Sequence, residues 1–150
     1  NTIQELLEMK VIPIINENDS VAVDELDHLT KFGDNDQLSA IVAHLSDADL
    51  LIMLSDIDGF YSANPNTDKN ATLYHRITEI TDSLEAAAGG EGSRFGTGGM
   101  SSKLKAAKRI FARDSQMILA NGEEPSIIFD ILEGQTIGTL FASSTYTEGD

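Results

Sequence analysis

Two carboxylates and one amide stand side by side in the turn Gly33-Asp34-Asn35-Asp36, directly before an apolar pattern with helical spacing. The simplest role for this turn is helix capping. An Asp or Asn side chain accepts hydrogen bonds from the free N–H groups at a helix start and suits its positive end. One such side chain is enough for a cap. The remaining Asn and Asp could hold an amine or orient a reacting group, so capping and chemistry both stay open.

A second candidate is the glycine-rich stretch Gly96–Lys103, with the sequence GTGGMSSK. Glycines let backbone N–H groups approach phosphate oxygens, and the helix that follows adds its positive end. Lys103 could then reach a phosphoryl group in transfer. The stretch is neither a Walker A motif nor G-x-G-x-x-G, and its alternative role is a flexible linker into a basic helix. A local positive patch, suited to an anionic ligand, follows from the basic residues gathered here: Lys103, Lys105, Lys108, Arg109 and Arg113.

Polar clusters follow three apolar runs that have the length of strands. In open α/β sheets, ligands bind beyond the carboxyl ends of the strands, so these clusters are expected to meet at one edge. Asn and Asp also favour simple turns, which is the alternative at each place. The clusters are Asn16, Glu17, Asn18 and Asp19 after 11–15, Ser55 and Asp56 after 50–54, and Asn121-Gly122 after 115–120.

The composition excludes several classes of protein. The 150 residues carry 25 acidic and 10 basic side chains, for a net charge of −15, which opposes a general nucleic-acid surface. The absence of cysteine excludes disulfides and thiolate metal sites, and fits a reducing cytosol. No apolar run is long enough to span a membrane, and the start has no signal-peptide pattern. The three histidines, His28, His44 and His75, lack metal-ligand spacing. If a metal is bound, carboxylates and phosphates would favour magnesium.

Strands and helices alternate along the chain, which predicts an α/β fold with a mostly parallel sheet and right-handed crossovers. The run at 50–54 predicts a strand buried on both faces. Residues 20–32 and 89–102 read as loops. The expected helices cover 3–9, 36–45, 81–88, 103–113 and 125–132, and the expected strands cover 11–15, 50–54, 115–120 and 137–141.

Several of these stretches, taken in order, resemble the glutamate 5-kinases of the amino acid kinase family. They are VIPIINENDSVAVDE, FGDNDQLSAIVA, LLIMLSDIDGFY, GTGGMSSKLKAAK and GTLF. The resemblance implies a three-layer αβα sandwich around a mostly parallel sheet. It also implies a cytoplasmic phosphotransferase that moves the γ-phosphate of ATP, with Mg2+, to the side-chain carboxylate of L-glutamate. The product would be L-glutamyl 5-phosphate, in the first step of proline biosynthesis. Such enzymes are commonly homo-oligomers inhibited by proline.

The resemblance also implies roles for individual residues. Glutamate would be bound by Asn16, Asp19 and Asn35, while Asp36 would organise the catalytic lysines. Lys103 would stabilise the moving phosphoryl group, and Mg2+ would be held mainly by the ATP phosphates. The implied ATP-binding residues are Ser55, Asp56, Thr97, Gly98, Gly99, Met100, Ser101, Ser102 and Lys103.

One departure from the family pattern is large. The glutamate 5-kinases begin with a strand and a glycine-rich turn that carry another catalytic lysine and a substrate-binding serine, and this sequence lacks both. We therefore expect residues 1–142 to be the C-terminal portion of a kinase domain, with 143–150 as a polar tail. We expect this portion alone to be inactive. Two alternatives remain, a kinase of the same fold with another acceptor and a non-catalytic module that senses proline or glutamate.

Overall fold

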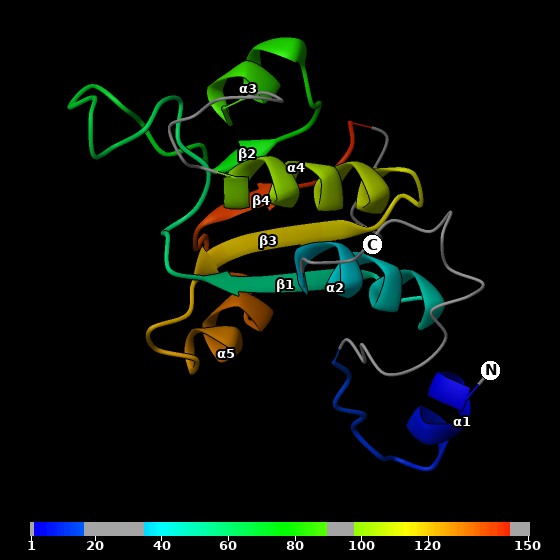
Figure 1. Ribbon diagram of the computed structural model, residues 1–150. Helices are drawn as coiled ribbons and strands as arrows, with labels where there is room; N and C mark the ends of the chain where they lie inside the picture. The colour runs from blue at the N-terminus through cyan, green and yellow to red at the C-terminus, as the bar shows by residue number, and fades with distance from the viewer. Residues whose placement is uncertain (1, 17–34, 90–97, 145–150) are drawn as a thin grey trace.

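The computed structural model describes residues 2–16, 35–89 and 98–144 (Figure 1). Its four-stranded sheet has the order β1-β3-β4-β2. β1 pairs with β3 and β2 with β4 in parallel, whereas β3 and β4 are antiparallel. The predicted α/β class with a mostly parallel sheet is therefore confirmed. The strands are β1 (Leu50–Ser55), β2 (Arg76–Ile77), β3 (Gln116–Asn121) and β4 (Thr139–Phe141).

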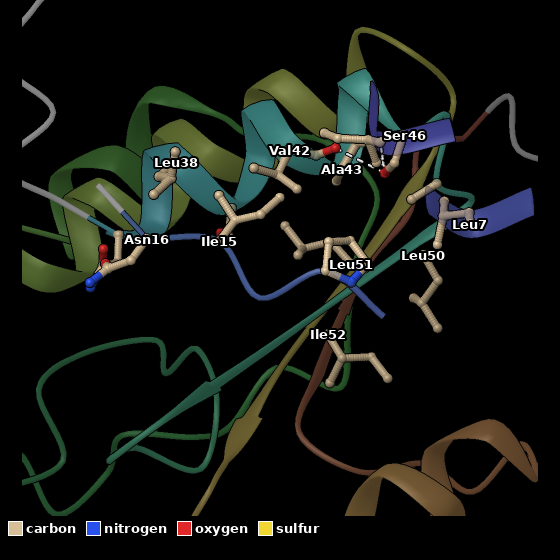
Figure 2. Close-up of a pocket in the computed structure, with 15 residues that line it drawn as sticks. Leu7, Ile15, Asn16, Leu38, Val42, Ala43, Ser46, Leu50, Leu51 and Ile52 are labelled. Atoms are coloured by element: carbon tan, nitrogen blue, oxygen red, sulfur yellow. Dashed lines mark hydrogen bonds between the residues drawn. The ribbon is translucent and has the colours of Figure 1, made fainter. Parts of the chain in front are cut away.

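The part of the chain that the structure describes has five helices, of which α1 lies apart from the sheet (Figure 1). α2 and α4 pack on β1 and β3, and α5 lies on the other side of these strands (Figures 1 and 2). Each helix that the apolar spacing predicted is present. None of these described helices is long and apolar enough to cross a membrane. The helices are α1 (Thr2–Glu8), α2 (Asn35–Leu45), α3 (Asp82–Ala87), α4 (Gly98–Phe111) and α5 (Ile127–Leu132).

The core forms where α2 and α4 cover the sheet. β3 is its centre, with Met117 and Leu119 fully buried. α4 turns Leu104, Ala107 and Ile110 toward the strands, at the i, i+3, i+6 spacing of one helix face. The two helices are also joined by polar contacts, because the Gln37 amide donates to the Ser102 carbonyl at 2.8 Å and accepts from Arg109 Nε at 3.0 Å. This packing places the starts of α2 and α4 near each other.

Two local predictions are wrong, and both depend on missing partners. The stretch 11–15 is not a strand, and Ile12 and Ile14 are 88% and 98% exposed. No described strand lies beside it to complete its hydrogen bonds, and Pro13 has no N–H to offer. β1 is not buried on both faces either, since Leu54 is 37% exposed and the strand pairs only with β3 among the described strands.

The glycine-rich stretch also differs from its prediction. Residues 98–102, expected in a loop, form the first turns of α4. The helix therefore begins at Gly98, five residues earlier than the basic pattern alone suggested. The remainder of that predicted loop from 90 to 97, the predicted loop at 20–32 and most of the polar tail lie outside the described residues.

Candidate functional site

The carboxyl ends of β1 and β3 bring two of the predicted polar clusters together. Ser55 and Asn121 stand opposite each other in the parallel register, and the Gly122 N–H donates to the Ser55 carbonyl at 2.8 Å. Glycine is required at 122 because a Cβ there would lie 2.8 Å from the Cβ of Leu54. The expectation that these clusters share one sheet edge is thus confirmed for the pair that follows β1 and β3.

The loop after β1 is held to this edge by side chains. The Ser55 hydroxyl donates to Asp56 Oδ1 at 3.1 Å. Asp58 accepts from the Asn121 amide at 3.0 Å and from the Tyr61 hydroxyl at 3.3 Å. Burial, the nearby charge of Asp58 and this hydrogen bond raise the pKa of Tyr61 above its ordinary value of 10. Neither Asp58 nor Tyr61 was predicted as a site residue, and the local signal for Asp58 is that it is the second aspartate of Ser-Asp-Ile-Asp.

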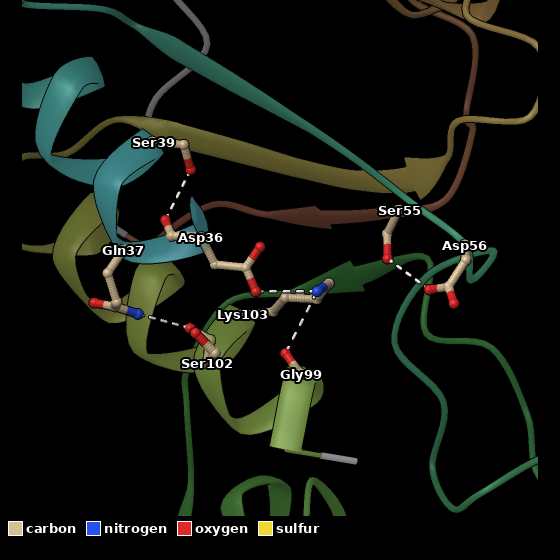
Figure 3. A network of polar contacts seen from close by, with 8 residues as sticks. All are labelled: Asp36, Gln37, Ser39, Ser55, Asp56, Gly99, Ser102 and Lys103. Atoms are coloured by element: carbon tan, nitrogen blue, oxygen red, sulfur yellow. Dashed lines mark hydrogen bonds and ion pairs between the residues drawn. The ribbon is translucent and has the colours of Figure 1, made fainter. Parts of the chain in front are cut away.

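The second half of the site lies at the starts of α2 and α4 (Figure 3). Lys103 Nζ contacts Asp36 Oδ2 at 3.0 Å, with the two side chains only 12% and 18% exposed. Lys103 also reaches back to the carbonyl of Gly99 at 3.5 Å. The Ser102 Oγ is buried and makes no hydrogen bond with any described residue. A fixed ammonium therefore stands one turn inside a helix whose first two residues are glycines.

A cavity of about 500 Å3 separates the N-terminal segment from α2 and β1 (Figure 2). Asn16 and Asn35, both predicted to bind substrate, line it together. Figure 2 shows Asn16 at one end of the cavity and Leu7 at the other. Most of the remaining wall is apolar, but Ser39 and Ser46 also line it, and Figure 2 shows Ser46 near Leu7, at the end away from Asn16. Its other lining residues include Ile15, Leu38, Val42, Ala43, Leu50, Leu51 and Ile52.

The structure brings some predicted residues together and leaves others untested. Asp36 meets Lys103, and Ser55 meets Asn121. Asp19 and Thr97 lie outside the described residues, as does Asp34 of the Gly33–Asp36 turn. Within 2–16, 35–89 and 98–144, no cluster of three or more His, Cys, Asp or Glu side chains is arranged to hold a metal ion. The remaining predicted ATP-binding residues are found in the first two turns of α4: Gly98, Gly99, Met100, Ser101 and Ser102.

The fold and this edge define an α/β protein in which polar groups gather at the carboxyl ends of two parallel strands. The model of the amino acid kinase family matches residues 1–121, and the chain belongs to that family. Among solved structures, the UMP kinase from Ureaplasma parvum shares the fold with a TM-score of 0.56 at 16% identity, over 95% of this chain and 52% of that chain. The isopentenyl phosphate kinase of T. acidophilum has a TM-score of 0.51 at 26% identity, over 71% of this chain and 38% of that chain.

Among curated relatives, the glutamate 5-kinase of Enterococcus faecalis is 67% identical over 141 residues, which are 94% of this chain and 52% of that protein. The glutamate 5-kinase of Lactiplantibacillus plantarum is 64% identical over 141 residues, 94% of this chain and 53% of that protein. The chain thus spans about half the length of the curated relatives it matches. The resemblance that the motifs indicated is confirmed.

Proposed function

We propose that this chain contributes the nucleotide side and part of the acceptor side of an ATP-dependent kinase for L-glutamate. The product would be L-glutamyl 5-phosphate, the first intermediate of proline biosynthesis. The observation that carries the proposal is the Asp36–Lys103 ion pair at 3.0 Å, beside the glycine start of α4. The high identity to proteins named glutamate 5-kinase supports the choice of acceptor.

The start of α4 fits a nucleotide phosphate. Gly98 and Gly99 add no side chains that would keep phosphate oxygens away from the free N–H groups at the helix start. The helix is 14 residues long, so the dipole gives this N-terminus a partial positive charge that favours an anion. A Cβ at Gly99 would lie against Lys103 Nζ, at 3.7 Å. Ser102 offers a buried hydroxyl that lacks a partner among the described residues. These groups are the donors that a triphosphate needs.

Charge repulsion is the main obstacle to this reaction, because a carboxylate must approach a triphosphate. Phosphoryl transfer depends mostly on positioning and on offsetting that charge. The Lys103 ammonium would lie against the transferred phosphoryl group, and Asp36 would fix its direction. Loss of one such donor typically costs about 3–4 kcal/mol of transition-state stabilisation. Mg2+ neutralises phosphate charge when it is bound. The nucleotide phosphates would supply most of its ligands.

The acceptor would enter from the cavity between α2 and the N-terminal segment. Asn16 and Asn35 both line this cavity, and their amides would bind the charged groups of glutamate. Asp19 is our candidate for the partner of the substrate ammonium. It would disfavour acceptors without that group, because the bound complex would then leave the carboxylate without its partner. We further infer a cytoplasmic homo-oligomer, with proline as a feedback inhibitor.

The test uses the full-length gene product. ADP release is measured with ATP alone, with ATP and L-glutamate, and with ATP and L-aspartate, and the acyl phosphate is trapped with hydroxylamine. Glutamate-dependent release with hydroxamate formation is expected, together with a large loss in Lys103→Ala. If ADP release depends on another acceptor instead, that acceptor replaces glutamate as the proposed substrate. If ATP does not bind but proline or glutamate does, the protein is a sensor and the kinase proposal is wrong.

A further inference from the structure

Thr139 is the buried polar residue of the described core. Its side chain on β4 is completely inaccessible to solvent. The hydroxyl accepts from the Phe60 N–H at 2.8 Å and donates to the Tyr74 carbonyl. These partners lie 79 and 65 positions away in the sequence. One hydroxyl therefore joins β4, the loop after β1 and the segment that leads into β2.

The loop has no freedom where it meets this hydroxyl. A Cβ on Gly59 would lie 2.6 Å from Thr139 Oγ1, so only glycine permits the approach. Phe60 is 1% exposed and its ring packs edge-on against Phe141, with centroids 6.3 Å apart. Its carbonyl accepts from the Tyr74 N–H at 2.8 Å. Both backbone polar groups of Phe60 are thus fixed, and Thr139 fixes one of them.

The other end of the same loop carries the predicted nucleotide contacts, Ser55 and Asp56. That end is held by the hydrogen bond from the Gly122 N–H to the Ser55 carbonyl. The middle of the loop is held by the hydrogen bond from the Asn121 amide to the Asp58 carboxylate. β3 therefore fixes the start and middle of the loop, and β4 fixes its end through Thr139. Only Ile57 to Gly59 separate Asp56 from Phe60, so the freedom of Asp56 depends on both anchors.

We propose that Thr139 is a positioning residue for nucleotide binding: its hydroxyl holds the loop from Ser55 to Phe60 in the conformation that accepts ATP. The inference rests on the proposed kinase function, although Thr139 itself does not contact the nucleotide. Thr139→Val keeps the shape and removes the hydroxyl, leaving a buried N–H and a carbonyl without this partner. If the competent loop falls to about a tenth of the population, the apparent Kd for ATP rises roughly tenfold.

The experiment compares Thr139→Val, Thr139→Ser and the core control Ile110→Val in the full-length gene product. Ile110 is 3% exposed on α4, so its truncation lowers stability away from the loop. We measure three quantities for each variant: amide hydrogen exchange at Phe60, the calorimetric Kd for ATP with Mg2+, and the KM for glutamate. For Thr139→Val, we expect faster Phe60 exchange, a roughly tenfold higher ATP Kd and a glutamate KM within about twofold. Thr139→Ser should restore protection and affinity, and Ile110→Val should leave both unchanged.

Each other result has a definite meaning. Unchanged ATP affinity in Thr139→Val, while the parent protein binds ATP, overturns the positioning role and leaves the kinase proposal intact. An equal loss of affinity in Ile110→Val reduces the effect to general stability and also overturns it. Failure of the parent protein to bind ATP removes the kinase proposal and this inference together, whatever the exchange at Phe60 shows.

Discussion

The Asp36–Lys103 ion pair allows a quantitative test of the proposed chemistry. Asp36→Asn retains the size of the side chain and removes its charge. At the observed 3.0 Å and an effective dielectric constant of about 20, the Coulomb attraction is roughly 5.5 kcal/mol. Desolvation and side-chain ordering offset much of it, because the two side chains are only 12% and 18% exposed. A net contribution of about 2 kcal/mol is enough to keep the ammonium directed, and its loss leaves Lys103 free to move.

The effect on turnover follows from that displacement. Misplacing a catalytic group by about 1 Å costs roughly 100-fold, so Asp36→Asn should lower kcat by about that factor. Lys103→Ala removes the donor itself and should lower kcat by about 100- to 1,000-fold. The double variant should be no slower than Lys103→Ala, because Asp36 acts through the lysine. The KM for glutamate should change by less than about threefold, since neither Asp36 nor Lys103 is among the proposed acceptor-binding residues.

The assay measures kcat, both KM values and thermal stability for the full-length gene product. Lys108→Ala is the matched control. Lys108 lies farther along α4 and pairs with Glu85 of α3, so its substitution should not change kcat. Multiplicative losses in the double variant would show that Asp36 and Lys103 act independently, contrary to the ion-pair argument. Unchanged kcat with reduced thermal stability would show that Asp36 has only a structural role at the start of α2.

Three further predictions concern other parts of the site. Ser102→Ala should change the free energy of unfolding by less than about 1 kcal/mol, yet weaken ATP binding roughly tenfold in calorimetry, because its buried hydroxyl has no partner among the described residues and is proposed to serve a phosphate. Gly138→Ala should lower the free energy of unfolding in urea by at least about 2 kcal/mol. Its φ is +66°, and a Cβ would lie 2.1 Å from the Leu119 carbonyl oxygen. Tyr61 should titrate above pH 10 by ultraviolet absorbance, and Asp58→Asn should lower its pKa. Since the raised pKa belongs to the folded state, its stabilising contribution is present below pH 10 and disappears as pH rises through that pKa.

These predictions have separate controls. Equal loss of stability and ATP binding in Ser102→Ala would make that hydroxyl structural. Gly134→Ala shares a positive φ of +88° but meets nothing within 4 Å, so it should cost less than Gly138→Ala, and equal costs would contradict the close-contact argument. Tyr61→Phe identifies the titration step, and an unchanged step in Asp58→Asn would exclude the carboxylate as a cause.

The main elements of the fold could be predicted because their patterns are local. α2 and α4 carry apolar residues at helical spacing, and β1 and β3 are short continuous apolar runs bounded by polar turns. β2 was missed because two residues are too few to form a pattern. The stretch 11–15 was wrongly assigned because an apolar run becomes a strand only beside another strand, which the described residues do not provide.

The candidate site divides in the same way. The sequence by itself determined the chemical groups, since Gly-Asp-Asn-Asp, Ser-Asp and Gly-Thr-Gly-Gly-Met indicate carboxylates, amides and phosphate-binding backbone. Only the tertiary structure decided which of them meet. Asp36 and Lys103 are 67 positions apart, and the Thr139 hydroxyl joins segments 79 and 65 positions away. Local patterns depend on neighbouring backbone and solvent exposure, whereas these contacts depend on how α2, α4 and β4 pack around β3, and no short stretch of sequence encodes that arrangement.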